Sequence, residues 1–330
     1  MKKAIILLAI VVIVISMVSG AAQPKLKEVR EKHEPELFAI EGVSGVSADE
    51  VTGEIIVYIE KPEISRKVPK KLEGFPVRHE VIGRIEALQT TTATRTFTTA
   101  YGATTYSTYS RTAKQRPVFG GISVGNPYIT AGTLGLVTVN NSGIPVVLSN
   151  AHVLALDSSA NFVAIGTPTW QPGKFDGGTS NDTIGALYKY IPITFNKIRA
   201  NNYADAAIST LTVNGSQGSI LNETNDGFYT INLTTEVSIG DKVRKSGRTT
   251  GVTTNNVTNT QASVKVYYTS SKWAIFKDQI LVRQPFSAGG DSGSAVDKEG
   301  KFVGLLFAGS DTITVVNKAK YIISGLGISI

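Results

Sequence analysis

The feature that most constrains the fold is a series of short apolar runs that continues from residue 117 to the end of the chain. The runs are rich in Val, Ile and Leu, and turns of Gly, Asn and Ser separate them, as in GTLGLVTV, IPVVLSNAHVLA, TIGALYKYIPI, DQILVRQP and GKFVGLLFAG. β-Branched residues favour strands, and many short strands with few helices are typical of barrels and sandwiches. The sequence therefore predicts a mainly β region over residues 117–330.

Two segments of different composition precede this region. Residues 23–88 start with the charged stretch PKLKEVREKHEPE, which predicts a helix or a loose tail, and continue with the apolar run EIIVYIEKPEI. We interpret them as a small α+β module, a pro-segment or a targeting module. Residues 89–116 consist mostly of Thr, Ser, Ala and Tyr without a helical period, which predicts an exposed linker; an edge strand is the alternative.

The first residues resemble a targeting sequence. A basic start, Met1-Lys2-Lys3, is followed by an apolar run from Ala4 to Val18 and by the small residues Ser19 and Ala21. This pattern predicts a signal peptide over residues 1–22 and a secreted or cell-surface protein. The alternative is an uncleaved anchor, the one condition under which we expect contact with a membrane.

Composition excludes several classes of function. The chain has no Cys, which excludes a thiol nucleophile, iron–sulfur clusters and Cys-bound zinc, and we expect neither a metal nor a cofactor. The net charge is +7, but Lys and Arg are scattered without an arginine-rich tract, so we expect no nucleic-acid partner.

Three segments contain residues suited to acyl transfer. His152 lies in VVLSNAHVLA, Asp205 in NNYADAAIST and Ser292 in SAGGDSGSAV. A serine nucleophile needs an adjacent base, and the oxyanion needs two converging backbone N–H groups. Each segment also has an ordinary explanation: a packed histidine, an aspartate that caps a turn and a Gly/Ser turn. Their joint occurrence in the order His, Asp, Ser favours the catalytic interpretation.

These segments resemble those of chymotrypsin/trypsin-like serine proteases. LSNAHVLA, ADAAI and GGDSGSAV match the three motifs of that family, and KVRKSGRTTGVTT resembles a hairpin in the second barrel of its bacterial members. The chain looks like a prokaryotic subgroup with a small N-terminal module. The resemblance covers residues 117–330 and implies two perpendicular antiparallel β-barrels of the chymotrypsin type, preceded by the α+β module.

The resemblance also implies roles for individual residues. His152 would be the general base and acid, Asp205 would orient its ring, and Ser292 would be the nucleophile. The backbone N–H groups of Gly290 and Ser292 would form the oxyanion hole. Asp291 would shape the loop between them.

The family pattern further implies a substrate pocket. Phe286 would form its floor, and Phe307, Ala308 and Gly309 its opposite wall. An uncharged pocket disfavours Lys, Arg and Glu, so we expect cleavage after small or medium apolar residues, with Asp311 as the nearest charge.

Residues 118–121 indicate whether the protein would need proteolytic cleavage to become active. The sequence VFGG at 118–121 resembles the activation terminus of animal enzymes, but Arg116-Pro117 precedes it, and most proteases do not cleave before proline. We therefore expect the nucleophile loop to be preformed in the unprocessed chain.

The sequence as a whole predicts an exported serine endopeptidase that hydrolyses protein or peptide substrates through an acyl-enzyme. The alternative is a surface binding or adhesion protein built on an inactive trypsin-like fold. An α/β-hydrolase esterase is excluded, because the chain has no G-x-S-x-G elbow and its order is not Ser, Asp, His.

Overall fold

The computed structural model describes residues 25–88 and 108–330. The predicted signal peptide, 1–22, and most of the predicted linker, 89–107, lie outside the described residues. Within these two ranges, no helix combines the length and the apolar character needed to cross a membrane.

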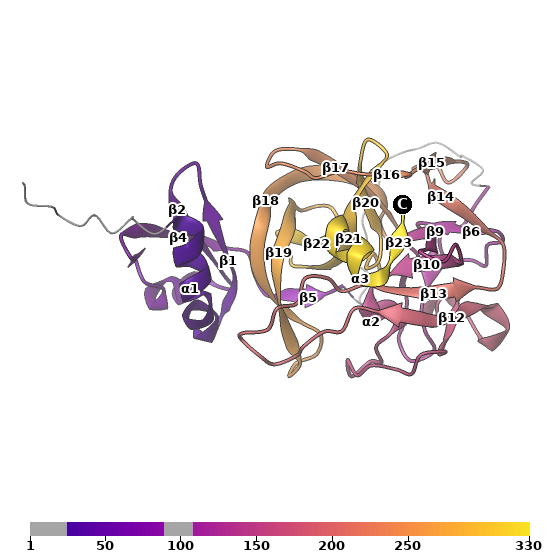
Figure 1. Cartoon of the computed structure of the whole chain (residues 1–330), viewed down its shortest axis with the longest axis horizontal. Coiled ribbons are helices and arrows are strands. Elements are labelled where there is room, and N and C mark those ends of the chain that lie inside the picture. Colours follow the sequence, from indigo (N-terminus) through magenta and orange to yellow (C-terminus); the bar gives the residue numbers. More distant parts are fainter. Residues whose placement is uncertain (1–24, 89–107) are drawn as a thin grey trace, which may run out of the picture.

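The N-terminal module is a helix packed on a small sheet (Figure 1). Ile55, Val57 and Ile59 alternate along one strand, so all three side chains lie on the same face of the sheet, where Leu37 and Phe38 of the helix pack against them. Its elements are α1 (Leu26–Ala39), β1 (Val43–Asp49), β2 (Glu54–Ile59), the 3₁₀ helix η1 (Pro62–Lys67), β3 (Lys71–Leu72) and β4 (Phe75–Val81).

A six-stranded antiparallel sheet forms the first half of the β-rich region. Its strand order is β11-β12-β13-β10-β9-β23, so the last strand of the chain returns to pair with β9. The strands are β9 (Leu136–Asn140), β10 (Pro145–Ser149), β11 (Pro168–Trp170), β12 (Thr183–Tyr190), β13 (Ala207–Leu211) and β23 (Ile328–Ser329). Further strands lie outside this sheet: β14 (Gly215–Leu221) pairs with β6 (Val118–Gly120) and β15 (Phe228–Thr230), and β7 (Ser123–Val124) pairs with β8 (Gly132–Thr133). β16 (Leu233–Thr234) pairs with a strand of the second half.

The second half is a closed antiparallel barrel. The strands follow the order β17-β20-β21-β22-β19-β18, and β17 also pairs with β18, which closes the ring. They are β17 (Lys242–Gly247), β18 (Gly251–Tyr267), β19 (Trp273–Arg283), β20 (Ala295–Lys298), β21 (Lys301–Gly309) and β22 (Ile313–Lys318). Helix α3 (Ala319–Leu326) leads from β22 to β23.

The module joins this barrel edge to edge. β1 pairs antiparallel with the second half of β18, through Gly45 with Val264 and Val46 with Ser263, so one sheet runs from the module into the barrel (Figure 1). The last strand of residues 23–88, β5 (Ile85–Ala87), pairs with β18 and β21. The predicted fold class, mainly β with a preceding α+β module, is confirmed.

The end of the predicted linker lies against the β-rich region. Arg111 donates hydrogen bonds to the carbonyl oxygens of Gly121 (3.1 Å) and Asn222 (2.7 Å) and to the hydroxyl of Ser246 (2.7 Å). Because a guanidinium has five donors and no acceptor, several carbonyl groups can hold it at once. The structured part of the β-rich region therefore begins before residue 117.

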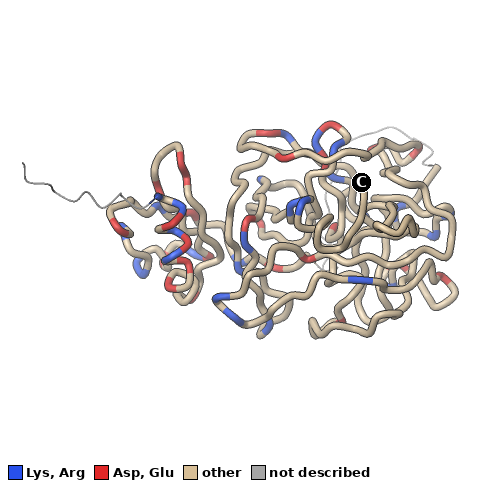
Figure 2. Tube along the Cα trace, in the orientation of Figure 1, with Lys and Arg blue, Asp and Glu red and all other residues tan. Residues whose placement is uncertain are grey.

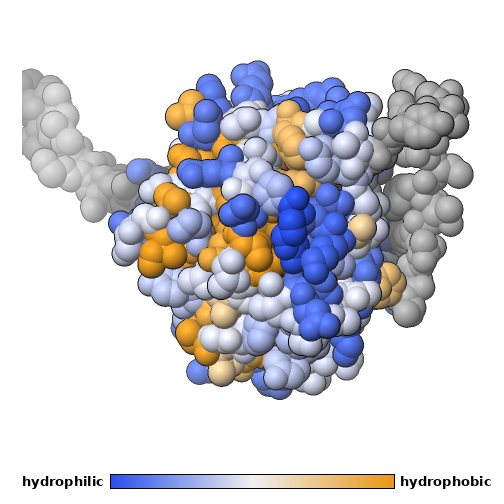
Figure 3. Space-filling view, turned by 90° about the vertical axis from the view of Figure 1, so that its right-hand side faces the viewer, coloured by the Kyte–Doolittle hydropathy of each residue, from blue (hydrophilic) through white to orange (hydrophobic). Residues whose placement is uncertain are grey.

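Charge and hydrophobicity are distributed differently over the molecule. Acidic and basic residues alternate closely in the module, whereas long stretches of the β-rich region carry neither (Figure 2). On the face shown in Figure 3, hydrophobic residues form several separate areas among hydrophilic ones. Net charge therefore does not describe the contacts between the module and the barrel, which depend on individual pairs of residues.

Candidate active site

His152 and Asp205 are brought together by the pairing of β10 with β13. Ser149, the last residue of β10, lies opposite Ala207, the first residue of β13. In an antiparallel pair, the residues after one strand and before the next lie at the same end of the sheet. The short helix α2 (Ala151–Leu154) starts there and carries His152.

The two side chains form a buried hydrogen-bonded pair. His152 Nδ1 lies 2.7 Å from Oδ2 of Asp205, and the backbone N–H of His152 donates to Oδ1 at 3.1 Å. The hydroxyl of Tyr268 donates to the same Oδ2 at 2.6 Å, and the backbone N–H of Asp205 donates to the side-chain oxygen of Asn317 at 2.9 Å. Because a carboxylate only accepts, Nδ1 carries the proton and Nε2 is left as the basic nitrogen.

The carboxylate of Asp205 stays ionised in this buried position. Burial raises its pKa, but the neighbouring His152 and the hydrogen bonds from His152 and Tyr268 outweigh that effect and hold the pKa below its ordinary value. Burial and the adjacent carboxylate raise the pKa of Tyr268 well above its ordinary value, so its hydroxyl remains a donor.

Ser292 lies in the loop between β19 and β20, and residues of the first half hold that loop. The backbone N–H of Thr133 donates to the carbonyl of Ser292 at 2.7 Å, and its hydroxyl donates to the carbonyl of Gly290 at 2.9 Å. Gly293 has a φ of +93°, and a Cβ there would lie 2.1 Å from Oγ of Ser149. Glycine is required after the serine for both reasons.

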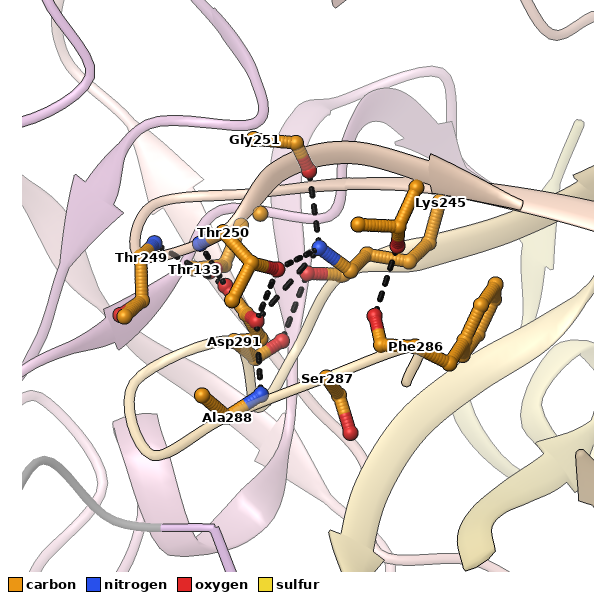
Figure 4. A network of polar contacts seen from close by, with 12 residues as sticks. Thr133, Lys245, Thr249, Thr250, Gly251, Phe286, Ser287, Ala288 and Asp291 are labelled. Atoms are coloured by element: carbon orange, nitrogen blue, oxygen red, sulfur yellow. Dashed lines mark hydrogen bonds and ion pairs between the residues drawn. The ribbon is translucent and has the colours of Figure 1, made fainter. Parts of the chain in front are cut away.

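The carboxylate of Asp291 organises the loop from the other side (Figure 4). Its Oδ1 accepts the backbone N–H groups of Thr249 (2.9 Å) and Thr250 (3.1 Å). Its Oδ2 accepts the hydroxyl of Thr250 (2.6 Å) and the N–H of Ala288 (3.0 Å), and lies 3.4 Å from Nζ of Lys245. Asp291 and Lys245 are both fully buried, so this ion pair fixes the loop inside the protein.

This arrangement needs no freed amino terminus. Lys245 supplies the cation beside Asp291, while the backbone N–H of Val118 donates to the carbonyl of Asn214 within the chain. Burial lowers the pKa of Lys245 to about 8, and the nearby Arg111 acts in the same direction against the attraction of Asp291. These contacts agree with the expectation of a preformed loop.

No hydrogen bond joins Ser292 to His152 in this structure. Oγ of Ser292 donates to the carbonyl oxygens of Leu88 (3.0 Å) and Phe307 (3.3 Å). Among the described residues, Nε2 of His152 is buried without a partner. The two segments nevertheless approach each other: a Cβ on Gly132 would lie 2.4 Å from the side chain that follows His152 and 3.0 Å from the carbonyl of Ser292.

The predicted pocket residues do not share one environment. Phe286 belongs to a buried apolar cluster against which Leu88 packs, and a Cβ on Gly309 would lie 3.5 Å from Cδ1 of Leu88. The side chains of Phe307 and Ala308 belong instead to a different buried cluster, and the backbone carbonyl of Phe307 accepts the N–H of Leu88. The structure thus gathers Phe286 and Gly309 around one apolar side chain.

Sequence reasoning missed three residues of this site. Tyr268 has no signal in the sequence beyond its place in an apolar run, and the only signal for Lys245 is that its hairpin resembles one in bacterial members of the family. For Leu88, the composition indicates only the end of the module. Across the ranges 25–88 and 108–330, no group of three His, Cys, Asp or Glu residues could hold a metal ion.

Comparison with solved structures gives matches at low sequence identity. A Nocardiopsis protease is 16% identical with a TM-score of 0.46, over 64% of this chain and 99% of that chain. Protease A of Thermobifida fusca is 17% identical with a TM-score of 0.47, over 64% and 97%. A glutamic-acid-specific serine protease that uses a histidine triad in substrate binding is 18% identical with a TM-score of 0.48, over 64% and 100%.

These proteins are proteases by name. No family model matches the chain, and no curated protein does.

Proposed function

We propose that the chain is an exported serine endopeptidase that cleaves peptide bonds through an acyl-enzyme on Ser292. The observation that carries the proposal is the buried pair of His152 and Asp205, in which Nδ1 of His152 lies 2.7 Å from Oδ2 of Asp205. The other ring nitrogen of His152, Nε2, has no hydrogen-bond partner among the described residues. A buried imidazole with one oriented nitrogen and one unused basic nitrogen is what a general base requires.

The reaction begins with a rotation of the Ser292 side chain. Its Oγ leaves the carbonyl of Phe307 and turns toward Nε2 of His152, a change between staggered rotamers about one bond. His152 takes the hydroxyl proton as Oγ attacks the substrate carbonyl, and later gives that proton to the departing amine. Asp205 stabilises the imidazolium that forms in between.

The developing oxyanion would be held by backbone donors. The N–H of Gly290 already donates to a carbonyl oxygen of the chain at 2.8 Å, and that of Ser292 is the second donor we propose. Donors fixed in a buried loop need no reorganisation as charge develops, which is the main source of oxyanion stabilisation.

The test is peptide hydrolysis by the purified protein and two variants. We expect Ser292→Ala and His152→Ala each to lower kcat by about 10⁴-fold or more, with the fold retained. Ser324→Ala and His79→Ala are the matched controls, because both residues lie outside the site, and they should leave kcat unchanged. Near wild-type turnover of either site variant would contradict the assignment.

A second candidate is a binding protein on an inactive protease fold. The missing hydrogen bond between Ser292 and His152 favours it, because a site that never forms this bond has no activated nucleophile. Such a protein would hydrolyse no peptide, and the Ser292→Ala change would leave its binding intact.

A further inference from the structure

The strand β5 occupies the site as an additional strand. Its Ala87 pairs antiparallel with Ala308 of β21, and its Glu86 pairs with Gly309. The backbone N–H of Leu88, the next residue, donates to the carbonyl of Phe307 at 3.2 Å. A peptide that extends a sheet in this way is held by main-chain hydrogen bonds, and its side chains are selected by pockets.

The carbonyl oxygen of Leu88 receives two donors from the nucleophile loop. The N–H of Gly290 lies 2.8 Å away, and Oγ of Ser292 lies 3.0 Å away. No other described carbonyl accepts both of these groups. The carbonyl carbon of Leu88 is therefore the acyl carbon presented to Ser292.

The side chains of this segment alternate as those of a bound peptide would. Ile85 is fully buried and Ala87 packs against the same core cluster, whereas Glu86 points to solvent. Leu88 is half-buried against the apolar cluster that contains Phe286, over Gly309. A leucine fits this uncharged surface, and a charged side chain there would have to lose its hydration without gaining a partner.

From these contacts we infer that the chain is its own substrate and that Ser292 cleaves the peptide bond on the carboxyl side of Leu88. The inference rests on the proposed peptidase activity and specifies its preference: leucine or an apolar residue of similar size on the acyl side. The cut would separate the module from the β-rich region.

The step balances without any added reagent except water. Oγ of Ser292 forms an ester bond to the carbonyl carbon of Leu88 as the carbon–nitrogen bond to the next residue breaks. The hydroxyl proton passes through Nε2 of His152 to the departing nitrogen, which becomes a free amine. Water then hydrolyses the ester, leaving a carboxylate on Leu88 and restoring Ser292.

The experiment follows the intact mass of the full chain during incubation after purification. We expect a fragment whose sequence starts at Gln89, and we expect the Ser292→Ala chain to stay uncut at that bond. The fraction cut per minute should not change over a tenfold range of protein concentration, because acyl carbon and nucleophile lie in one molecule. A rate proportional to concentration, or a cut at this bond in the Ser292→Ala chain, would overturn the inference.

Substitutions of Leu88, the residue on the acyl side of the proposed cut, test which side chain the site prefers. Leu88→Asp should slow the cut at least about 100-fold, because a charge would enter an apolar site without a partner. Leu88→Met should be cut at close to the wild-type rate, and Glu86→Gln, changed at an exposed position, serves as the control. Equal cutting of the Asp and Met variants would contradict the preference.

The two proposals fail in distinguishable ways. A chain that hydrolyses added peptides but remains uncut after Leu88 refutes self-cleavage and leaves the peptidase intact. A wild-type chain that does not cut itself, together with a full-length Leu88→Asp variant that hydrolyses no added peptide although its contact over the site is weakened, refutes both.

Discussion

At the scale of single residues, Tyr268 is the least expected part of the site. Its hydroxyl shares Oδ2 of Asp205 with His152, at 2.6 Å and 2.7 Å. The second hydrogen bond keeps the carboxylate ionised and fixes the direction from which the imidazole approaches. Tyr268 touches no reacting atom, so it acts as a positioning residue.

We predict that Tyr268→Phe lowers kcat about tenfold and leaves KM nearly unchanged, since a hydrogen bond to a charged group contributes about 1.5–3 kcal/mol. The acidic limb of the pH–rate profile should also move to higher pH, because the pKa of Asp205 rises when it loses one of the contacts that lower it. Tyr203→Phe, at a more exposed ring, is the control. An unchanged profile together with an unchanged kcat would show that the hydroxyl has no catalytic effect.

At the scale of elements, the sequence predicts the segments that carry the candidate catalytic residues, but it does not predict which strands pair or in which register. The order of His152, Asp205 and Ser292 was readable because each stands in a distinctive local segment. The pairing of Ser149 with Ala207, which brings the first two together, depends on the whole sheet. Period-2 patterns specify which face of a strand is buried, but they do not specify its partner.

The same limit explains why the sequence does not predict β5 as a strand of the site. The change of composition after Leu88 predicts a boundary there, but β5 is only three residues long and has no pattern of its own. Its position is determined by two neighbours, β18 and β21, that follow much later in the chain. Such short strands form through tertiary contacts rather than local preference.

The buried pair of Lys245 and Asp291 gives the nucleophile loop a dependence on pH. With the pKa of Lys245 lowered to about 8, the cation is lost above that pH and the loop loses its ion pair. We predict that kcat/KM falls with an apparent pKa near 8. Lys245→Met should be at least about tenfold less active at pH 7 and should show no further decline of this kind, since breaking a buried pair is costly.

Rising pH should change stability and activity in opposite directions through this one group. The folded pKa of Lys245, about 8, lies below the unfolded value of 10.5, so the unfolded chain binds more protons between these pH values. This group alone therefore makes the free energy of unfolding rise with pH in that window. Loss of activity at pH 9 with a retained Tm supports the account, whereas parallel loss of both points to general unfolding. Lys242→Met, at an exposed position of the same strand, is the control.

At the scale of the whole molecule, a buried cluster of charges holds the module on the barrel. Arg30 donates to the carbonyl of Gln261 at 3.0 Å and pairs with Glu34 at 3.1 Å. Glu34 accepts the hydroxyl of Ser263 at 2.7 Å and lies 3.7 Å from Nζ of Lys277. The cluster joins α1 to β18 and β19, so docking depends on these specific partners.

We predict that Glu34→Gln lowers the free energy of unfolding of the full chain by about 3 kcal/mol, because it removes the buried carboxylate that pairs with the buried guanidinium of Arg30. Urea titration measures the change. Glu36→Gln, on the same helix but with a side chain 77% exposed, should change it by less than about 0.5 kcal/mol. A loss equal to that control would mean that the cluster does not hold the module in place.

The central claim, that Ser292 is a nucleophile activated by His152, is tested most directly by labelling with a fluorophosphonate and mapping the modified peptide. The protein should first be freed of its module, because Leu88 covers the hydroxyl in the intact chain. The account predicts one stoichiometric adduct, on Ser292, and labelling slowed by about 10³-fold or more in His152→Ala. No adduct on Ser292, or equal labelling of the His152→Ala protein, would contradict it.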